Sequence, residues 1–457
     1  MKRTVLWTAC ALLALTLAAP AVSPAQTLAQ SLSGCGTAAP TRTIRANPSN
    51  YKTLMVGLLP GDKVTLDPGT YTQGLRFWNV NGQVDRCIVV EGPASGSPAL
   101  FLGTDLWNTV SFKNASYIAV KNLQLDGQRK LGDGVKVEVD STYAHHIWIE
   151  GLQMKNYNNT VQTVGINTKA KAWNWVIRKN VIVGAGTGMY LGKSDGNGEF
   201  VNGLIENNLI YNTLGYGIQI KHQLSRDTAI GIPATAKTII RHNVISKESG
   251  SLSGTEARPN LLVGHWPLSG AGAGDVYVIY GNVFWENPYE ALFQGEGNIA
   301  FYDNLLVNKT GPFGMRIQKH NDLPRKIDIF NNTVLAKGTG IQITSGAVGY
   351  VQRVIGNAVF AATPLYGGVQ TGNVVDTYAN AAKYLNNPTA PLGTVDLYPK
   401  VGALQGALID MTSLNFLLDY NRDFNLLTRV FDRRGAYAGE GVNAGWWPKL
   451  EVMPIEQ

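Results

Sequence analysis

Short apolar runs recur along most of the chain, and pairs of runs flank a polar corner. Within the runs apolar and polar residues alternate, which is the period of a β-strand and not of a helix. The corners follow one another at 22 to 39 residues and are Asn122, Gly151, Asn180, Asn208, Asn243, Asn282, Asn304, Asn332 and Asn357. Asn and Gly tolerate the backbone conformations of tight turns. A corner that returns at this interval predicts stacked coils of short strands.

This repeat favours an all-β fold, a right-handed parallel β-helix of about ten or more coils, whose strands stack at ~4.8 Å around an apolar interior. A propeller would need antiparallel blades of more uniform period, and a helical solenoid would need a period of 3.6 residues. We expect a signal peptide over residues 1–25, an N-terminal cap over 26–50 and the β-helix over 51–375. Residues 376–457 lose the period and are expected to wrap the C-terminal end of the solenoid.

A second set of strands lies between the corners, with first and third positions expected to point inward and second and fourth outward. The set reads VSFKN, VKVEV, INTKA, MYLGK, IQIKH, LLVGH, LFQGE, MRIQK and IQITS. In this alignment Lys221 shares its outward column with Gly192, Gly264 and Gly295. We therefore expect a bare trough beside Lys221, in which a ligand approaches the backbone.

Histidines, cations and long loops gather around this trough. The loops 223–236, 247–259 and 267–274 would wall this sector, and loops on a rigid scaffold commonly carry function. We expect catalytic roles for Lys221, His222, His265 and Arg316. We expect substrate contacts from Tyr190, Lys193, Gln219, Arg258, Trp266, Phe293, Glu296, Lys319 and His320.

Each of these residues also has a structural interpretation. Lys221 could be a solvated strand residue, His222 a turn residue, and His265 part of a packed wall. Glu296 could pair with Lys319 in a surface ion pair of little energetic worth. The aromatic residues could stack on sugar rings or pack under the loops. The convergence of all these features on one sector favours a carbohydrate cleft, whereas Arg241 and His242 belong to the other strand set and are expected to be structural.

The residue types in this sector match the elimination chemistry of uronic-acid polymers. That reaction needs a cation at the carboxylate, a base for the C5 proton and a donor for the leaving oxygen. A glycoside hydrolase needs two carboxylates at a defined separation, and only Glu296 lies on the cleft columns. A C5-epimerase shares the proton-abstraction step, and a non-catalytic glycan-binding protein would also suit the fold.

The chain resembles the pectate-lyase-like group of right-handed parallel β-helix proteins over residues 50–375. Residues 54–77, LMVGLLPGDKVTLDPGTYTQGLRF, look like the opening coil of polysaccharide lyase family six, the alginate lyases and chondroitinase B. The resemblance implies a catalytic lysine, which Lys221 matches, and an arginine on the next coil. This chain has His265 on that coil, with Arg258 just before it as a substitute. The family's calcium-binding acids are missing from 215-GYGIQI-220, so no cofactor is predicted and calcium is not supported by an acidic cluster.

The N-terminal sequence and the net charge indicate the compartment of the protein and the kind of partner it binds. The basic start, the apolar run from Val5 to Ala19 and the small residues before position 26 predict a signal peptide, and hence a secreted or periplasmic protein. Removing Lys2 and Arg3 with no acid lowers the formal charge from +7 to +5, which suits an acidic polysaccharide or a surface that is merely basic. Cys35 and Cys87 would then be the two remaining cysteines, and we expect them to form a disulfide that pins the cap.

Overall fold

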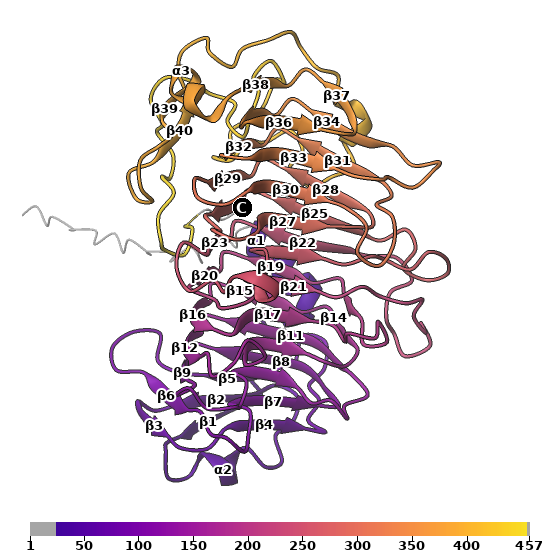
Figure 1. Cartoon of the computed structure of the whole chain (residues 1–457). Helices are drawn as coiled ribbons and strands as arrows, with labels where there is room; N and C mark the ends of the chain where they lie inside the picture. The colour runs from indigo at the N-terminus through magenta and orange to yellow at the C-terminus, as the bar shows by residue number, and fades with distance from the viewer. Residues whose placement is uncertain (1–23, 455–457) are drawn as a thin grey trace, which may run out of the picture.

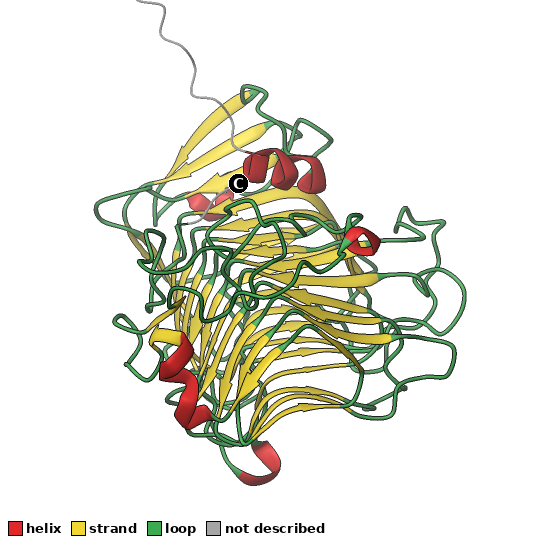
Figure 2. Cartoon of the chain, turned by 90° about the horizontal axis from the view of Figure 1, so that it is seen from above, coloured by secondary structure: helices red, strands yellow, loops and turns green. Residues whose placement is uncertain are grey.

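The computed structural model describes residues 24–454, and it confirms the predicted parallel β-helix. Three long parallel sheets, here called A, B and C, contain 15, 12 and 11 strands. The chain passes from sheet A to sheet B to sheet C in each coil and then returns to sheet A one level higher (Figure 1). Seen from above, the strands surround the interior and the helices lie at the periphery (Figure 2).

The strands of each sheet follow one another in chain order, with consecutive strands hydrogen-bonded in parallel. Sheet A contains β1 (Arg42–Ala46), β2 (Asp62–Leu66), β5 (Ile88–Glu91), β8 (Ala115–Lys121), β11 (Ala144–Glu150), β15 (Val176–Arg178), β19 (Leu204–Glu206), β22 (Lys237–Arg241), β25 (Val276–Tyr280), β28 (Ile299–Tyr302), β31 (Ile327–Phe330), β34 (Gln352–Ile355) and β37 (Val369–Thr371), with β14 (Ala172–Trp173) beside β11 and β18 (Phe200–Val201) beside β14. Sheet B contains β3 (Gly69–Tyr71), β6 (Ala99–Leu102), β9 (Gln124–Asp126), β12 (Gln153–Tyr157), β16 (Val181–Ala185), β20 (Leu209–Tyr211), β23 (Val244–Ser246), β26 (Val283–Trp285), β29 (Leu305–Asn308), β32 (Thr333–Ala336), β35 (Ala358–Phe360) and β38 (Val374–Asp376). Sheet C contains β4 (Leu75–Trp78), β7 (Val110–Lys113), β10 (Val135–Val137), β13 (Val164–Thr168), β17 (Thr187–Leu191), β21 (Ile218–Ile220), β24 (Leu261–Val263), β27 (Ala291–Gly295), β30 (Phe313–Ile317), β33 (Thr339–Ile343) and β36 (Thr363–Tyr366).

The polar corners between sheets A and B form a continuous ladder of asparagine side chains. Each amide nitrogen donates to the amide oxygen of the asparagine one coil above, as from Asn208 to Asn243 at 2.9 Å. The ladder runs through Asn180, Asn208, Asn243, Asn282, Asn304, Asn332, Asn357 and Asn373. Because these buried amides are paired within the stack, each corner is satisfied without solvent.

In most corners the left-handed backbone does not fall on the ladder asparagine itself. In most coils the residue with positive φ precedes the ladder asparagine, as Asn207 does with a φ of 52°. Only Asn122 and Gly151, in the first two corners, adopt the left-handed conformation themselves. The alternation therefore located the corners, but the amide ladder, and not the backbone, explains why asparagine recurs there.

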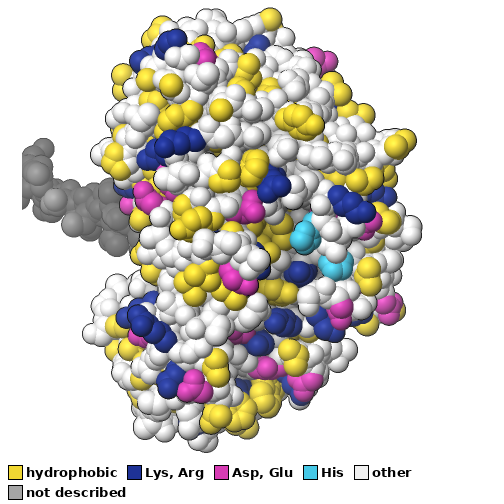
Figure 3. Space-filling view, in the orientation of Figure 1, with side chains coloured by type: hydrophobic (Ala, Val, Ile, Leu, Met, Phe, Trp, Pro, Cys, Tyr) yellow, Lys and Arg dark blue, Asp and Glu magenta, His cyan; other side chains and the backbone are white. Residues whose placement is uncertain are grey.

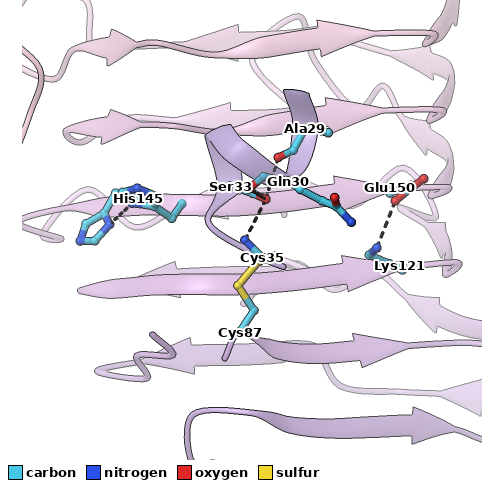
Figure 4. Close-up of a disulfide and its surroundings, with 9 residues drawn as sticks. Ala29, Gln30, Ser33, Cys35, Cys87, Lys121, His145 and Glu150 are labelled. Carbon is cyan, nitrogen blue, oxygen red and sulfur yellow. Dashed lines mark hydrogen bonds and ion pairs between the residues drawn. A yellow bond between two sulfur atoms is a disulfide. The ribbon is translucent and has the colours of Figure 1, made fainter. Parts of the chain in front are cut away.

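The N-terminal part packs against the outer face of sheet A. Helix α1 (Pro24–Ser33) contacts β11 and β15, and a short helix α2 (Tyr51–Leu54) lies beside β1. Cys35 and Cys87 form the predicted disulfide, which joins the segment after α1 to the strand region of β5 (Figure 4). The predicted signal peptide falls mostly on residues 1–23, which lie outside the described residues. No helix within residues 24–454 is long and apolar enough to cross a membrane.

The segment after β38 runs back along the side of the solenoid and does not stay at its end. It contains η2 (Tyr378–Asn380), α3 (Ala381–Tyr384), the antiparallel strands β39 (Leu385–Asn387) and β40 (Asp396–Pro399), and η3 (Thr412–Leu414). The carbonyl of Met453 accepts a hydrogen bond of 2.9 Å from the side chain of Asn207, several coils below the top. The last described residues therefore lie beside the middle coils of the solenoid.

Candidate functional site

The outer face of sheet C carries most of the predicted cleft residues. Tyr190 and Gln219 stand side by side on consecutive strands, β17 and β21. Ile218 and Ile220 are fully buried, so the alternation directs Gln219 and Lys221 outward as predicted. Histidine side chains lie beside Lys and Arg on this face of the molecule (Figure 3).

The predicted alignment of one strand, LFQGE, is wrong by one residue. Strand β27 pairs with β24 so that Phe293, and not Leu292, lies next to Leu261. Phe293 therefore points inward, and its ring packs 4.6 Å from that of Phe301 in the core. The expectation that Phe293 contacts substrate is wrong. A shift of one residue moves every side chain of a strand to the opposite face, and two adjacent apolar residues made both registers compatible with the pattern.

The corrected register also changes the trough. Gly295 faces the core, and Glu296 takes the outward place next to Gly264. Gly192 remains beside Lys221, where an added Cβ would lie 3.3 Å from the Lys221 Cβ. At Gly264 an added Cβ would lie 2.3 Å from the backbone nitrogen of His222, so the close approach of the two coils requires a glycine at this position.

Tyr190 lies between two lysines that come from the coils on either side of it. The Lys169 ammonium lies 5.1 Å from the centre of the Tyr190 ring, and the Lys221 ammonium lies 5.8 Å from it. Neither ammonium has a hydrogen bond or ion pair with another residue in the described part of the chain. Burial lowers the pKa of both lysines and raises the pKa of the Tyr190 hydroxyl. The three side chains thus form a cationic group around a protonated phenol.

His222 stands at the rim, one residue beyond Lys221. Burial and the neighbouring Lys221 charge lower the pKa of His222, so its imidazole is neutral at pH 7. Its Nε2 faces Gly196, on the turn that follows β17. Lys193 lies on the same turn and forms an ion pair of 2.7 Å with Asp195, in which both side chains are close to half exposed.

Two loops turn this part of sheet C into a small cavity of about 50 Å³, here called the Tyr190 cavity. Its floor and walls include Gln162, Lys169, Tyr190, Tyr216, Gln219 and Arg258. Arg258 lies 5.7 Å from the centre of the Tyr216 ring, and it donates to the backbone carbonyls of its own loop. Gln219 and Arg258 were both predicted to contact substrate, and both line this cavity.

The loop that carries Arg258 is held by a buried lysine. The Lys247 ammonium donates to the carbonyls of Gly215 and Arg258, the latter at 2.7 Å. Burial and the nearby Arg258 charge lower the pKa of Lys247 to about 7. Lys247 thereby ties the loop of residues 247–259 to the chain that enters β21.

His265 and Trp266 lie in the wall beyond the cleft and do not face it. His265 is 2% exposed, and its two ring nitrogens face the carbonyls of Trp266 and Leu323, the latter at 3.1 Å. Trp266 is 1% exposed and stacks on Tyr277 at 4.2 Å. The structure contradicts the expected substrate contact of Trp266, and it gives His265 no ring nitrogen free to act on a ligand. The packed-wall interpretation holds for both residues.

Glu296 serves the loop above it. One carboxylate oxygen accepts hydrogen bonds from the backbone nitrogens of His320, Asn321 and Asp322 at 2.7 to 3.0 Å. Glu296 is 1% exposed, which contradicts its expected role as a substrate contact, and no ion pair joins it to Lys319. Lys319 and His320 are exposed at the rim, and the His320 charge contributes to lowering the pKa of His222.

Arg316 is on the expected face but far from Lys221 along the solenoid. Three strand spacings separate it from Gln219, through Leu262 and Gln294, which corresponds to ~14 Å. Its guanidinium forms an ion pair of 3.2 Å with Glu290 and lies over the Phe313 ring. The Arg316 guanidinium is therefore engaged with Glu290, and its predicted place in one catalytic set with Lys221 stays a prediction.

Lys169, Tyr216 and Lys247 were not predicted as site residues from the sequence. Lys169 had a readable signal, since it occupies the same outward column as Lys221, two coils earlier. Tyr216 and Lys247 lie outside the strand columns. Tyr216 lines the cavity and Lys247 holds the loop beside it, and the sequence carries no periodic signal for either role. Within residues 24–454 no group of three or more His, Cys, Asp or Glu side chains is arranged to hold a metal ion.

Comparison with known proteins adds only to the fold. No known protein family and no curated protein matches the chain. Among solved structures it is similar to an alginate lyase from Paenibacillus sp. str. FPU-7, with 15% identity, a TM-score of 0.34, and coverage of 74% of this chain and 98% of that one. It is also similar to the A-module of the mannuronan C-5 epimerase AlgE4 from Azotobacter vinelandii, with 17% identity, a TM-score of 0.45, and coverage of 69% and 87%. The pectate lyase Pel9A has 13% identity, a TM-score of 0.42, and coverage of 89% and 98%. At these identities the activities of those proteins are not transferred to this chain.

Proposed function

We propose that the protein is a secreted lyase that cleaves a uronic-acid-containing polysaccharide by β-elimination on the outer face of sheet C, around Lys169, Tyr190 and Lys221. The observation that carries the proposal is the approach of Lys169 and Lys221 to one tyrosine ring, with no ion pair at either ammonium within residues 24–454. Unpaired cations that are partly withdrawn from water favour an anionic ligand. An aromatic ring between them offers a surface on which a sugar can stack.

In the proposed reaction, the neutral amine of Lys221 takes the proton from C5 of a uronate. The electron pair of that C–H bond forms the C4=C5 double bond, and the C4–O bond breaks with its electrons on the leaving oxygen. Lys169 contacts the uronate carboxylate and lowers the energy of the enolate that develops there. The Tyr190 hydroxyl, which its raised pKa keeps protonated, gives its proton to the leaving oxygen.

The surroundings of Lys221 suit a base. Burial lowers its pKa, so a larger fraction of its amine is neutral near pH 7 than in an exposed lysine. His222 lies next to it as a neutral imidazole and is the second candidate for proton transfer. Hydrolysis is less well supported, because Glu256 is the single carboxylate among the residues that line the cavity, and that reaction uses a pair.

Export of the protein is part of the proposal. The predicted signal peptide and the disulfide between Cys35 and Cys87 both suit an oxidising compartment, where a polysaccharide substrate would also be found. The positive formal charge of the chain favours association with an acidic polymer.

The test is incubation of the protein with alginate, pectate and glycosaminoglycans, with ultraviolet absorbance as the measure of unsaturated uronates. A rise in absorbance with one polymer is expected, and it should be lost in Lys221→Ala. The Tyr190→Phe variant keeps the ring and removes only the hydroxyl, so it should slow cleavage while retaining binding.

Other outcomes identify other functions. New reducing ends without absorbance would indicate a hydrolase, and changed proton spectra without cleavage would indicate a C5-epimerase. Binding without any chemical change would leave a glycan-binding protein. Each of these results would overturn the lyase proposal.

A further inference from the structure

A larger groove lies on the outer face of sheet A, at the beginning of its strands and outside the Tyr190 cavity. It has a volume of about 760 Å³, within the ~300–1,000 Å³ that small-molecule sites commonly span. Its floor is a column of residues on successive coils: Lys237, Val276, Asn298 and Lys326. We call it the sheet A groove.

Two aromatic side chains from different segments wall the groove. Tyr350 comes from the loop before β34 and is 41% exposed. Phe416 comes from the returning C-terminal segment and is 44% exposed. The buried Arg325 supports Tyr350, because its guanidinium lies 4.9 Å from the ring centre and is itself held by backbone carbonyls. The walls therefore present aromatic faces that are already ordered.

The two lysines of the groove lack a carboxylate partner. The Lys326 ammonium lies 4.7 Å from the centre of the Phe416 ring and has no ion pair with any described residue. The Lys237 ammonium donates to the Phe416 carbonyl at 3.0 Å and lies 5.6 Å from the same ring. The one acid that lines the groove, Asp328, is buried and accepts a hydrogen bond of 2.6 Å from Arg353. Two positive charges are thus left facing the space between two aromatic rings.

We propose that the sheet A groove is a second binding site, for a short stretch of an acidic polysaccharide. Its aromatic faces suit stacking against sugar rings, and Lys237 and Lys326 supply charges for the carboxylates. A nucleic acid would also stack on aromatics, but it is bound through a longer basic stripe along its backbone than two lysines provide. The acidic oligosaccharide is therefore the occupant that the groove fits.

The groove is separate from the Tyr190 cavity in the chain and in space. The loops 223–236 and 267–274 connect strands of sheet C to strands of sheet A, so they lie between the two sites. A buried ion pair of 2.7 Å between Arg226 and Asp275 joins these connections. A polymer held in the groove would raise the local concentration of chain ends and segments near the cavity.

The experiment is calorimetric titration of the protein with tetragalacturonate and tetramannuronate, in the Lys221→Ala background so that no ligand is consumed. Two sites are expected for at least one of these ligands. In the double variant Lys237→Gln/Lys326→Gln, affinity at one site should fall about tenfold or more while the other site is unchanged. The matched control is Lys52→Gln/Lys383→Gln, which removes the same charge from exposed lysines elsewhere and should leave both sites intact.

Three results would overturn this proposal. The first is a single site in the parent protein, and the second is equal affinities in the double variant and the control. The third is a double variant that no longer binds a single-stranded DNA oligonucleotide but still binds the uronates like the parent. A neutral tetrasaccharide of glucose should not bind the groove. Because the readout is binding, it stands apart from cleavage, so a protein without lyase activity could still show the second site. The Phe416→Ala variant provides an independent check, since it removes a wall without changing charge.

Discussion

The outer faces of sheets A and C carry similar charged and aromatic side chains, but the two sets differ in how far they are covered and in whether they are paired. On sheet A, Glu206 and Arg241 are buried and paired at 2.8 Å. The C-terminal segment covers them, because the Tyr280 hydroxyl beside them donates to Asp419 at 2.7 Å. On sheet C no such segment covers Lys221, which keeps an unpaired ammonium in the described structure. An outward direction in a strand is therefore not the same as exposure.

The comparison indicates which outward side chains of this solenoid can take part in chemistry. A charge that is outward and covered must be paired, since an unpaired buried charge is costly. A charge that is outward and only partly covered can remain unpaired and have its pKa lowered, as Lys221 does. The returning C-terminal segment thus makes the part of sheet A around Glu206 and Arg241 structural, whereas the sheet A groove and the outer face of sheet C remain open to ligands.

The largest expected effect belongs to the structural side. Glu206 pairs with Arg241 and also with Arg178, at 3.1 Å, and all three side chains are buried. Glu206→Ala leaves two guanidiniums without this carboxylate and should lower the free energy of unfolding by about 3–5 kcal/mol. Urea unfolding measures the loss, with Lys221→Ala as the control that should unfold like the parent.

Arg241→Ala sharpens the same comparison, because it should destabilise the protein while the turnover per folded molecule stays normal. Normal stability of both Glu206→Ala and Arg241→Ala would contradict the structural role of this part of sheet A.

The next effect concerns turnover on the sheet C side. Lys221→Ala should lower turnover by ~10²-fold or more, as expected for the loss of a proton-transfer group. His222→Ala should have the same direction of effect if the imidazole shares the proton transfer. Initial rates of uronate absorbance provide the measurement, and thermal unfolding should show little change in either variant. Full activity of Lys221→Ala would contradict the role of Lys221 as the base and would make His222 the candidate for it.

A pH profile tests the coupling between Lys221 and Glu296. A lysine that acts as a base must be neutral, so turnover should rise with pH through the pKa of Lys221. The negative charge of Glu296 raises this pKa against the lowering effect of burial. Glu296→Gln should therefore move the rising limb to lower pH, while the amide oxygen still accepts the backbone hydrogen bonds of residues 320–322. If the rising limb of Glu296→Gln lies at the same pH as that of the parent, Lys221 is not the group that controls the pH dependence.

The smallest effect is expected at the rim. Lys193 pairs with Asp195 at 2.7 Å, but both side chains are close to half exposed. Lys193→Ala should leave the free energy of unfolding nearly unchanged, because solvent screens such pairs. A large loss of stability in urea would mean that this turn is held more tightly than its exposure indicates.

Much of the fold and part of the site were predictable from the chain alone. Strict alternation around Ile218 and Ile220 was enough to direct Lys221 outward, and the recurring asparagines located the corners. The prediction failed where alternation was ambiguous, as at Leu292 and Phe293. There the choice of register depended on how β27 fits against β24, which is a contact between distant residues.

The sequence by itself determined the coil, because the two-residue period and the repeated corner are local properties that each segment carries. Only the tertiary structure decided which outward residues are covered. The path of the C-terminal segment buries Glu206 and Arg241, and loop packing buries His265 and Trp266 but leaves Lys169 and Lys221 beside Tyr190. The physical reason is that burial depends on segments distant in sequence, whereas the direction of a strand residue depends only on its neighbours.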